Sequence, residues 1–178
     1  DAYRLQALGC MNADPVQTPN LDAFAEEAVK LTHCVSNRPI CSPHRGMLLT
    51  GNYPHKSGVP RNCNSDRPDC YLRTDTVCWS DILAANGYNL GYIGKWHLTY
   101  PGDQPNELLG NRQYKKRQWD AFTQPGADRH GFDFWYSYGC CNTHFTPHYW
   151  TSHGGIEDRV DVEQWSVEHE TDVAINYL

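Results

Sequence analysis

The sequence has little of what a membrane-spanning or nucleic-acid-binding protein needs. No stretch approaches the ~18 consecutive apolar residues of a transmembrane helix. The formal net charge is −6, and no basic stripe is present that could follow a phosphate backbone. The one basic cluster, residues 115–117, fits a solvated loop. These shortages argue against a membrane span in the chain and against a nucleic-acid partner.

The sequence also lacks a Cys-x-x-Cys pair, although it contains eight cysteines. That spacing is typical of zinc ribbons and thioredoxin-like sites, so the sequence favours neither, and a Cys/His metal-binding module does not fit. Cys63 and Cys70 flank a polar loop and could form a disulfide, which would suit an oxidising compartment. The alternative is that most of the cysteines are buried thiols, and spacing alone does not decide between the two.

What is present is the composition of an ordinary globular protein, with 178 residues of which 39% are hydrophobic and 20% are charged. This length allows one domain with its own core. The chain begins with Asp1 and ends in a predicted helix at residues 167–178 that leads into nothing. We therefore expect residues 1–178 to be the first portion of a longer protein.

Apolar spacing and turn residues predict alternating helices and strands. Thr18 followed by Pro19 is typical of a helix start, and apolar residues then recur at three- and four-residue spacing. Further along we expect a strand at residues 31–36, a loop at 52–75, a helix at 76–86 and a strand at 88–93. The residues of the 76–86 helix expected to face the core are Val77, Trp79, Ile82 and Leu83. A helix, then Gly87, then a strand is one step of a layered α/β fold.

Residues 41–51, Cys-Ser-Pro-His-Arg-Gly-Met-Leu-Leu-Thr-Gly, predict a short helix with a reactive side chain at its start. Pro43 suits the first helical turn, and Gly51 is typical just past a helix end. Cys41 would stand just ahead of the first turn, where unpaired amides favour an anion. Arg45 is a cation at the helix end that disfavours cations, which indicates that it faces a negative charge. We expect an oxyanion site here; the alternative is a buried cysteine beside a helix start.

Residues 87–98, Gly-Tyr-Asn-Leu-Gly-Tyr-Ile-Gly-Lys-Trp-His-Leu, form a second motif. Lys95 and His97 are two positions apart, so both side chains would point to one side of an extended backbone. An ammonium and an imidazole on that side could hold the oxygens of an anionic ester. Taken singly, Lys95 could be a surface lysine and His97 a hydrogen-bonded loop histidine.

The two motifs resemble, in the same order, the two signatures of the type I sulfatases: Cys-x-Pro-x-Arg with Leu-Thr-Gly, and Gly-Tyr with Gly-Lys-x-His-Leu. Residues 1–10 resemble the first metal-binding segment of that family, and residues 18–22 and 131–133 are also similar to it. Leu90 stands where the family usually has Thr, and Asn52 stands where an Arg often follows Leu-Thr-Gly.

The resemblance implies an alkaline-phosphatase-like α/β fold, layered, with a mixed sheet flanked by helices and incomplete in this chain. Residues 1–178 would be the N-terminal part of a sulfatase catalytic domain. The resemblance also implies that a maturation enzyme oxidises Cys41 to formylglycine, whose hydrate attacks sulfur in a covalent mechanism. Arg45 and Lys95 would neutralise charge on the sulfate oxygens. His97 would orient the diol or relay its proton, a role suited to a pKa near neutrality.

The metal site implied by the resemblance binds a divalent cation, usually calcium, through Asp1 and Cys41. Ala2 stands where the family has a second Asp, and the loss of one carboxylate would weaken such a site without abolishing it. Because further ligands of the family would lie beyond residue 178, we expect the chain alone to be inactive. The resemblance also favours export to the periplasm or beyond.

A sulfated carbohydrate is the substrate class that the resemblance favours. One alternative is a phosphodiester or phosphonate monoester hydrolase of the same fold, and another is a non-catalytic glycan-binding homologue, which only Ala2 supports. A set of aromatic and polar residues late in the chain could contact a sugar ring or could be half-buried loop residues. They are Tyr138, Asn142, His144, Phe145, His148, Tyr149, Trp150, Thr151 and His153.

Overall fold

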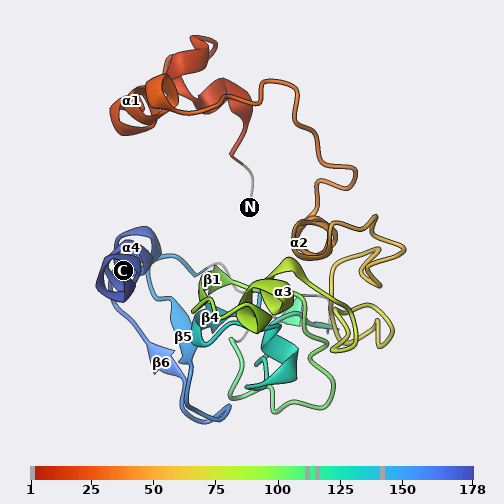
Figure 1. Cartoon of the computed structure of the whole chain (residues 1–178). Coiled ribbons are helices and arrows are strands. Elements are labelled where there is room, and N and C mark those ends of the chain that lie inside the picture. The colour runs from red at the N-terminus through yellow and green to blue at the C-terminus, as the bar shows by residue number, and fades with distance from the viewer. Residues whose placement is uncertain (1–2, 111–112, 115–116, 141–142) are drawn as a thin grey trace. The chain divides into compact units, whose positions relative to one another are not determined.

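The computed structural model describes residues 3–110, 113–114, 117–140 and 143–178. These residues divide into two compact units, Asp1–Ser36 and Asn37–Leu178 (Figure 1). Within the described ranges, no helix has both the length and the apolar character that crossing a bilayer requires.

The first unit contains the short 3-10 helices η1 (Leu5–Ala7) and η2 (Gly9–Met11) and the helix α1 (Pro19–Glu27). Thr18 is the N-cap residue of α1 as predicted, but its side chain does not cap the helix. Instead its hydroxyl accepts a hydrogen bond from the Gly9 amide (2.8 Å) and donates one to the Asp22 carboxylate (2.8 Å). The same carboxylate accepts the Cys10 amide at 2.7 Å. These bonds fasten η2 to the first turn of α1.

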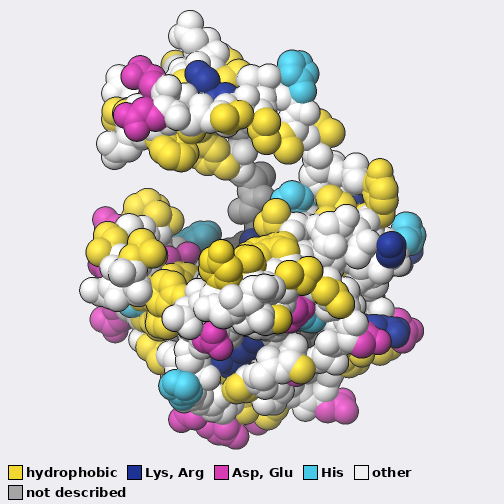
Figure 2. All heavy atoms as spheres, viewed as in Figure 1, with side chains coloured by type: hydrophobic (Ala, Val, Ile, Leu, Met, Phe, Trp, Pro, Cys, Tyr) yellow, Lys and Arg dark blue, Asp and Glu magenta, His cyan; other side chains and the backbone are white. Residues whose placement is uncertain are grey.

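The predicted apolar face of α1 is present, and it lies on the surface of this unit (Figure 2). Leu21 and Phe24 line an apolar groove of about 220 Å³, to which residues of η1 and residues 28–32 also contribute. The strand predicted at residues 31–36 is wrong: they form a turn and extended chain. A strand needs a ladder partner for its backbone groups, and no described segment pairs with these residues.

The second unit is built around a four-stranded sheet of order β1-β4-β5-β6 (Figure 1). Its strands are β1 (Gly91–Lys95), β4 (Phe134–Tyr138), β5 (His148–Thr151) and β6 (Val160–Asp161). The other elements are α2 (Cys41–Thr50), α3 (Trp79–Ala85), η3 (Ala127–Arg129), α4 (Ser166–Tyr177) and the short ladder of β2 (Gln113–Tyr114) with β3 (Arg117–Gln118). β1 runs parallel to β4, whereas the β4–β5 and β5–β6 pairs are antiparallel. The predicted layered α/β fold with a mixed sheet flanked by helices is thereby confirmed.

The core next to β1 is aromatic. Trp96 and Trp135 are each 1% exposed, and their ring centroids lie 5.1 Å apart in an edge-to-face arrangement. Tyr92 packs edge-on against Trp96 at 4.9 Å, and Phe132 also packs on Trp96. Aromatic pairs with these offsets add stabilisation beyond the area that they bury. This packing fixes the end of β1, where the second motif lies.

The helix predicted at residues 76–86 is shorter than expected. The Cys78 amide donates to the Asp81 carboxylate at 2.8 Å, and this capping box starts α3 at Trp79, so Val77 lies outside the helix. The prediction that Val77 and Ile82 face the core is wrong, because they are 65% and 55% exposed. Trp79 is half exposed and packs edge-on against Phe132. Apolar side chains therefore gather on the outer side of α3 (Figure 2), which no other described element of the second unit covers.

The other predicted elements differ mainly in their bounds. Gly87 ends the α3 turn with a φ of 83°, as expected, but the strand predicted at residues 88–93 is β1, which begins at Gly91. The loop at residues 52–75 is confirmed, and the predicted helix at 167–178 is α4. Of the basic cluster at residues 115–117, residues 115–116 lie outside the described residues, and Arg117 forms an ion pair with Asp66.

Candidate active site

The first motif forms α2, and its start is held by the loop that follows the helix. The helix begins at Cys41 itself, with Ile40 as the N-cap residue, rather than after Cys41 as predicted. The Ser42 amide donates to the side-chain oxygen of Asn62 (3.0 Å), and the Ser42 hydroxyl accepts the Cys63 amide (3.1 Å). Ser42 is buried, whereas Cys41 is half-buried. The loop therefore binds both the amide and the hydroxyl of Ser42. Residue 41, at the first position of α2, stays half-buried.

Two further features fix α2. Gly46 packs against Val59 so closely that a Cβ at this position would lie 3.3 Å from the valine side chain. Gly51 ends the helix with a φ of 65°, and its amide donates to the Met47 carbonyl, as the motif predicts. The segment that carries Cys41 is therefore a rigid, tightly packed helix.

Lys95 and Cys41, which are 54 positions apart in the sequence, lie side by side. Lys95 Nζ is 3.6 Å from Cys41 Sγ, and the lysine is only 7% exposed. The Lys95 carbonyl accepts hydrogen bonds from Arg45 Nη1 and from the Tyr92 hydroxyl, both at 2.5 Å. Arg45 thus joins α2 to the end of β1 and brings a second positive charge to the backbone of Lys95. An anion at residue 41 would find the Lys95 ammonium preorganised in a partly desolvated site.

His97 lies just after β1 and is 2% exposed. Its φ of 52° is left-handed, so the extended backbone on which the sequence prediction placed Lys95 and His97 on one side does not reach His97. His97 Nε2 lies 3.0 Å from the Cys63 carbonyl, which can only accept, so Nε2 carries the proton. Nδ1 is therefore an acceptor, buried and without a hydrogen-bond partner among the described residues. His97 reaches α2 through Cys63, whose amide is bound by Ser42.

The charge state of His97 differs from the expectation. Burial, and then the positive charge of Lys95, lowers the pKa of His97 to about 3. The expectation of a pKa near neutrality is therefore wrong for this site, because the imidazole is desolvated beside a cation. His97 is a neutral imidazole at physiological pH, able to accept a proton or a hydrogen bond at Nδ1.

The seven described cysteines, which exclude Cys141, form no disulfide. Cys63 and Cys70 are both buried and lie within hydrogen-bond reach of each other, so the buried-thiol alternative is confirmed for this pair. The hydrogen bond with Cys63 is the main cause that lowers the pKa of the Cys70 thiol to about 6. The same contact and burial raise the pKa of Cys63. This pair holds the loop that binds Ser42 and His97.

Of the two predicted metal ligands, Asp1 lies outside the described residues and only Cys41 is described. Among the described residues, one group of three potential ligand atoms lies within 4.8 Å: Cys78, Asp81 and His130. A thiol and an imidazole do not suit calcium, which prefers oxygen ligands. The Asp81 carboxylate also accepts the Cys78 amide and contacts His130 Nδ1 at 3.2 Å, so it is engaged in capping α3. The described residues therefore do not assemble a calcium site.

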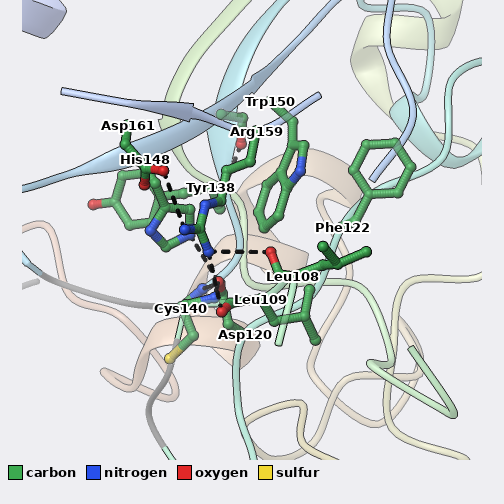
Figure 3. Close-up of polar contacts among 12 residues, drawn as sticks. Leu108, Leu109, Asp120, Phe122, Tyr138, Cys140, His148, Trp150, Arg159 and Asp161 are labelled. Carbon is green, nitrogen blue, oxygen red and sulfur yellow. Dashed lines mark hydrogen bonds and ion pairs between the residues drawn. The ribbon is translucent and has the colours of Figure 1, made fainter. Parts of the chain in front are cut away.

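Sequence reasoning missed the buried carboxylate of Asp120, which is 0% exposed. It accepts the amides of Gly110 (2.8 Å) and Cys140 (2.7 Å) and contacts His148 Nε2 at 2.8 Å (Figure 3). Burial alone would raise the pKa of Asp120, but these hydrogen bonds hold it below its usual value. The sequence offered one signal, a lone acidic residue between Trp119 and Ala121 in an aromatic segment. Asp120 therefore connects the segments that contain Gly110, Cys140 and His148.

The aromatic and polar residues late in the chain were interpreted either as contacts to a sugar ring or as half-buried loop residues, and the structure treats them differently. Tyr138, His148, Tyr149 and Trp150 are buried in β4 and β5, which favours a packing role for them. His144 is bound to the Ser166 hydroxyl at 2.8 Å, and Phe145 is exposed. Asn142 lies outside the described residues.

A mixed sheet flanked by helices is the architecture of the alkaline-phosphatase-like class of hydrolases, and this chain also pairs a cysteine with a lysine at a helix start. The sequence profile of the Sulfatase family matches residues 1–161, so the chain belongs to the sulfatase family.

Named relatives agree with this membership. An endo-4-O-sulfatase of Bacteroides thetaiotaomicron is 46% identical over 100% of this chain and 37% of its own length. An ulvan-active sulfatase of Formosa agariphila is 37% identical over 93% of this chain and 27% of its own length. The crystal structure of yidJ, a candidate sulfatase from Bacteroides fragilis, superimposes with a TM-score of 0.92 at 41% identity, over 99% of this chain and 38% of that one. The chain therefore spans well under half the length of each of these proteins.

Proposed function

We propose that the protein containing this chain is a sulfuric ester hydrolase that removes sulfate from a sulfated carbohydrate, and that residues 1–178 form the N-terminal part of its catalytic domain. The observation that carries the proposal is the 3.6 Å separation of Lys95 Nζ and Cys41 Sγ, which joins the two motifs in one site. The two relatives named for 4-O-sulfated and ulvan substrates support a polysaccharide as the substrate class.

In this proposal Cys41 is the precursor of formylglycine, made by a separate maturation enzyme, and the hydrated aldehyde supplies a hydroxyl nucleophile. The site fits such a group for two reasons. A hydroxyl at residue 41 would have the Lys95 ammonium as a neighbour. Two positions after Lys95, His97 also offers a buried acceptor, Nδ1, which has no described partner. Residue 41 is only half-buried, so a substrate can approach it.

The roles of the other residues follow from their contacts. Lys95 stabilises negative charge on the sulfate oxygens. Arg45 holds the Lys95 carbonyl through its Nη1 (2.5 Å) and so fixes the lysine backbone, and its charge adds to the field at the α2 start. His97 is neutral, so it accepts a hydrogen bond or a proton at Nδ1 rather than contributing a positive charge.

The sulfatase family generally uses a metal ion. We propose calcium as the ion, with Asp1 and an oxygen of the formylglycine made from Cys41 as two of its ligands. A single described position cannot make a site of six to eight oxygen ligands, so no step is assigned to the ion. Export to the periplasm or beyond is also part of the proposal, and cell fractionation of the source organism tests it.

The experiment is a parallel assay of the full-length protein, produced together with a formylglycine-generating enzyme. Release of inorganic sulfate from 4-O-sulfated disaccharides is compared with hydrolysis of matched phosphodiester and phosphonate esters. We expect faster turnover of the sulfate esters, loss of turnover in Cys41→Ala, and unchanged turnover in the control Cys34→Ala. Faster turnover of the phosphorus esters would favour the phosphodiesterase alternative. Binding without turnover of any ester would favour the non-catalytic one.

A further inference from the structure

The hydroxyl of Tyr92 lies where the two motifs of the proposed active site meet. It donates a hydrogen bond to the Lys95 carbonyl at 2.5 Å. It also accepts one from Arg45 Nη1 at 3.3 Å. Arg45 Nη1 donates in addition to the same Lys95 carbonyl. The three groups therefore form a closed triangle of hydrogen bonds that joins β1 to α2.

The ring of Tyr92 is held by other aromatic rings. It stacks on Trp135 with the centroids 5.2 Å apart and an angle of 24° between the ring planes. It also packs edge-on against Trp96 at 4.9 Å and against Phe132 at 5.2 Å. A phenylalanine would keep all of these ring contacts, so packing accounts for the ring but not for the hydroxyl. A polar group among aromatic side chains costs free energy unless it is hydrogen-bonded, and here its partners belong to the two cationic residues of the site.

Tyr92 keeps its proton in this environment. Burial raises the pKa of its hydroxyl above the usual value. A protonated hydroxyl can donate to the Lys95 carbonyl while it accepts from Arg45. Tyr92 therefore holds both groups without adding a negative charge, which would cancel part of the positive field at residue 41.

The Lys95 carbonyl lies where the chain leaves the sheet. Lys95 is the last residue of β1, and His97, two residues later, has a left-handed φ of 52°. At this point side chains of Tyr92 and Arg45 bind the carbonyl. The orientation of that peptide group sets the direction in which the Lys95 side chain leaves the backbone. The Tyr92 hydroxyl thus helps to determine where Nζ lies, and small displacements of a catalytic group have large effects on rate.

We propose that Tyr92 is a positioning residue, whose hydroxyl holds the Lys95 backbone and Arg45 so that Lys95 Nζ stays 3.6 Å from Cys41 Sγ. This inference rests on the proposed function, because the place of the ammonium matters for the charge that develops on a sulfate ester. The alternative is that the hydroxyl only satisfies its own hydrogen bonds in the core. Its loss would then act on stability and not through Lys95.

The experiment is a double-mutant cycle in the matured full-length protein, with Tyr92→Phe and Lys95→Met as the two changes and a 4-O-sulfated disaccharide as the substrate. The kcat values are normalised to the fraction of residue 41 present as aldehyde. We expect Tyr92→Phe to lower kcat about three- to tenfold and to change KM by less than about twofold. In the Lys95→Met background the same change should alter kcat by less than about 1.5-fold, because the ammonium that Tyr92 positions is gone.

Tyr149→Phe is the matched control, because it removes the hydroxyl of another tyrosine in the same sheet. That hydroxyl donates to Glu170 of α4 at 2.9 Å and contacts neither motif. Tyr149→Phe should leave kcat within about 1.5-fold of its parent in both backgrounds. A Tyr92→Phe loss no larger than that of the control would overturn the assignment. So would an equal fold-loss from Tyr92→Phe in the wild-type and Lys95→Met backgrounds.

A second measurement does not depend on turnover. In full-length protein made without the maturation enzyme, mass spectrometry follows alkylation of Cys41 by iodoacetamide at neutral pH, with the exposed Cys34 as internal reference. A nearby ammonium favours the reactive thiolate, so Tyr92→Phe should slow alkylation of Cys41 about twofold or more, and Tyr149→Phe should not. If the wild type hydrolyses no sulfate ester, the proposed function fails, yet this rate still decides whether Tyr92 positions Lys95. An unchanged rate in Tyr92→Phe would overturn the assignment even in an active enzyme.

Discussion

Replacement of Lys95 by methionine removes the charge next to residue 41 while keeping a side chain of similar length and volume. In the structure the ammonium lies 3.6 Å from Cys41 Sγ and is 7% exposed. At that separation a unit charge contributes about 4–5 kcal/mol if the effective dielectric constant is about 20. We take about 3 kcal/mol of this as the expected loss, which is about a hundredfold in rate. Loss of one preorganised donor in other enzymes costs about as much, ~10²–10³ in kcat.

The assay is kcat/KM of the full-length protein on a 4-O-sulfated disaccharide, divided by the fraction of residue 41 present as aldehyde. This normalisation separates loss of catalysis from loss of maturation. We expect Lys95→Met to lower the normalised kcat/KM about a hundredfold, whereas Lys56→Met, at an exposed lysine, should leave it unchanged. A Lys95→Met protein with at least half of the wild-type value would refute the electrostatic role of this lysine.

Three further predictions concern stability. Unfolded His97 titrates near pH 6.5 but its folded pKa is about 3, so the unfolded chain takes up protons first and stability falls as the pH drops from 6.5 toward 3. Measured by urea unfolding, the free energy of unfolding of the wild type should therefore fall by about 2 kcal/mol more than that of His97→Gln between about pH 7.5 and pH 5. Equal decreases would contradict the neutral state assigned to His97. Asp120→Asn should lower the free energy of unfolding by about 2–4 kcal/mol because buried donors lose their acceptor, while the exposed Asp69→Asn should change it by less than about 0.5 kcal/mol. Gly139→Ala should cost more than about 2 kcal/mol in the same measurement because a Cβ there would lie 2.5 Å from the Ala121 nitrogen, and an unchanged midpoint would show that the backbone at Ala121 moves to make room.

The elements with local signals were predictable from the sequence. Gly51 is needed for the left-handed residue that ends α2, and Gly87 plays the same part after α3, so both helix ends were placed correctly. Helix starts were less accurate, since a capping box at Cys78 overrode the apolar spacing that indicated an earlier start. The prediction of a strand at residues 31–36 was wrong because a short apolar run forms a strand only beside a partner strand, which the sequence alone does not reveal.

The site was predictable as a set of residue types but not as a geometry. The motifs drew attention to Cys41, Arg45, Lys95 and His97, and the structure brings Cys41, Arg45 and Lys95 into one cluster of contacts. The charge state of His97 depends on its burial, which no local pattern encodes. Asp120 was missed because its importance comes from contacts with Gly110 and Cys140, which are 10 and 20 positions away in the sequence.

The central claim is that residue 41 is the reacting position, carrying a carbonyl group generated from its thiol. Mass spectrometry of the peptide that spans this position, in protein purified from its natural source, tests the claim most directly. We predict a mass that corresponds to an aldehyde, together with labelling by a carbonyl-reactive hydrazide. An intact Cys41 thiol in a preparation that hydrolyses sulfate esters would contradict the account.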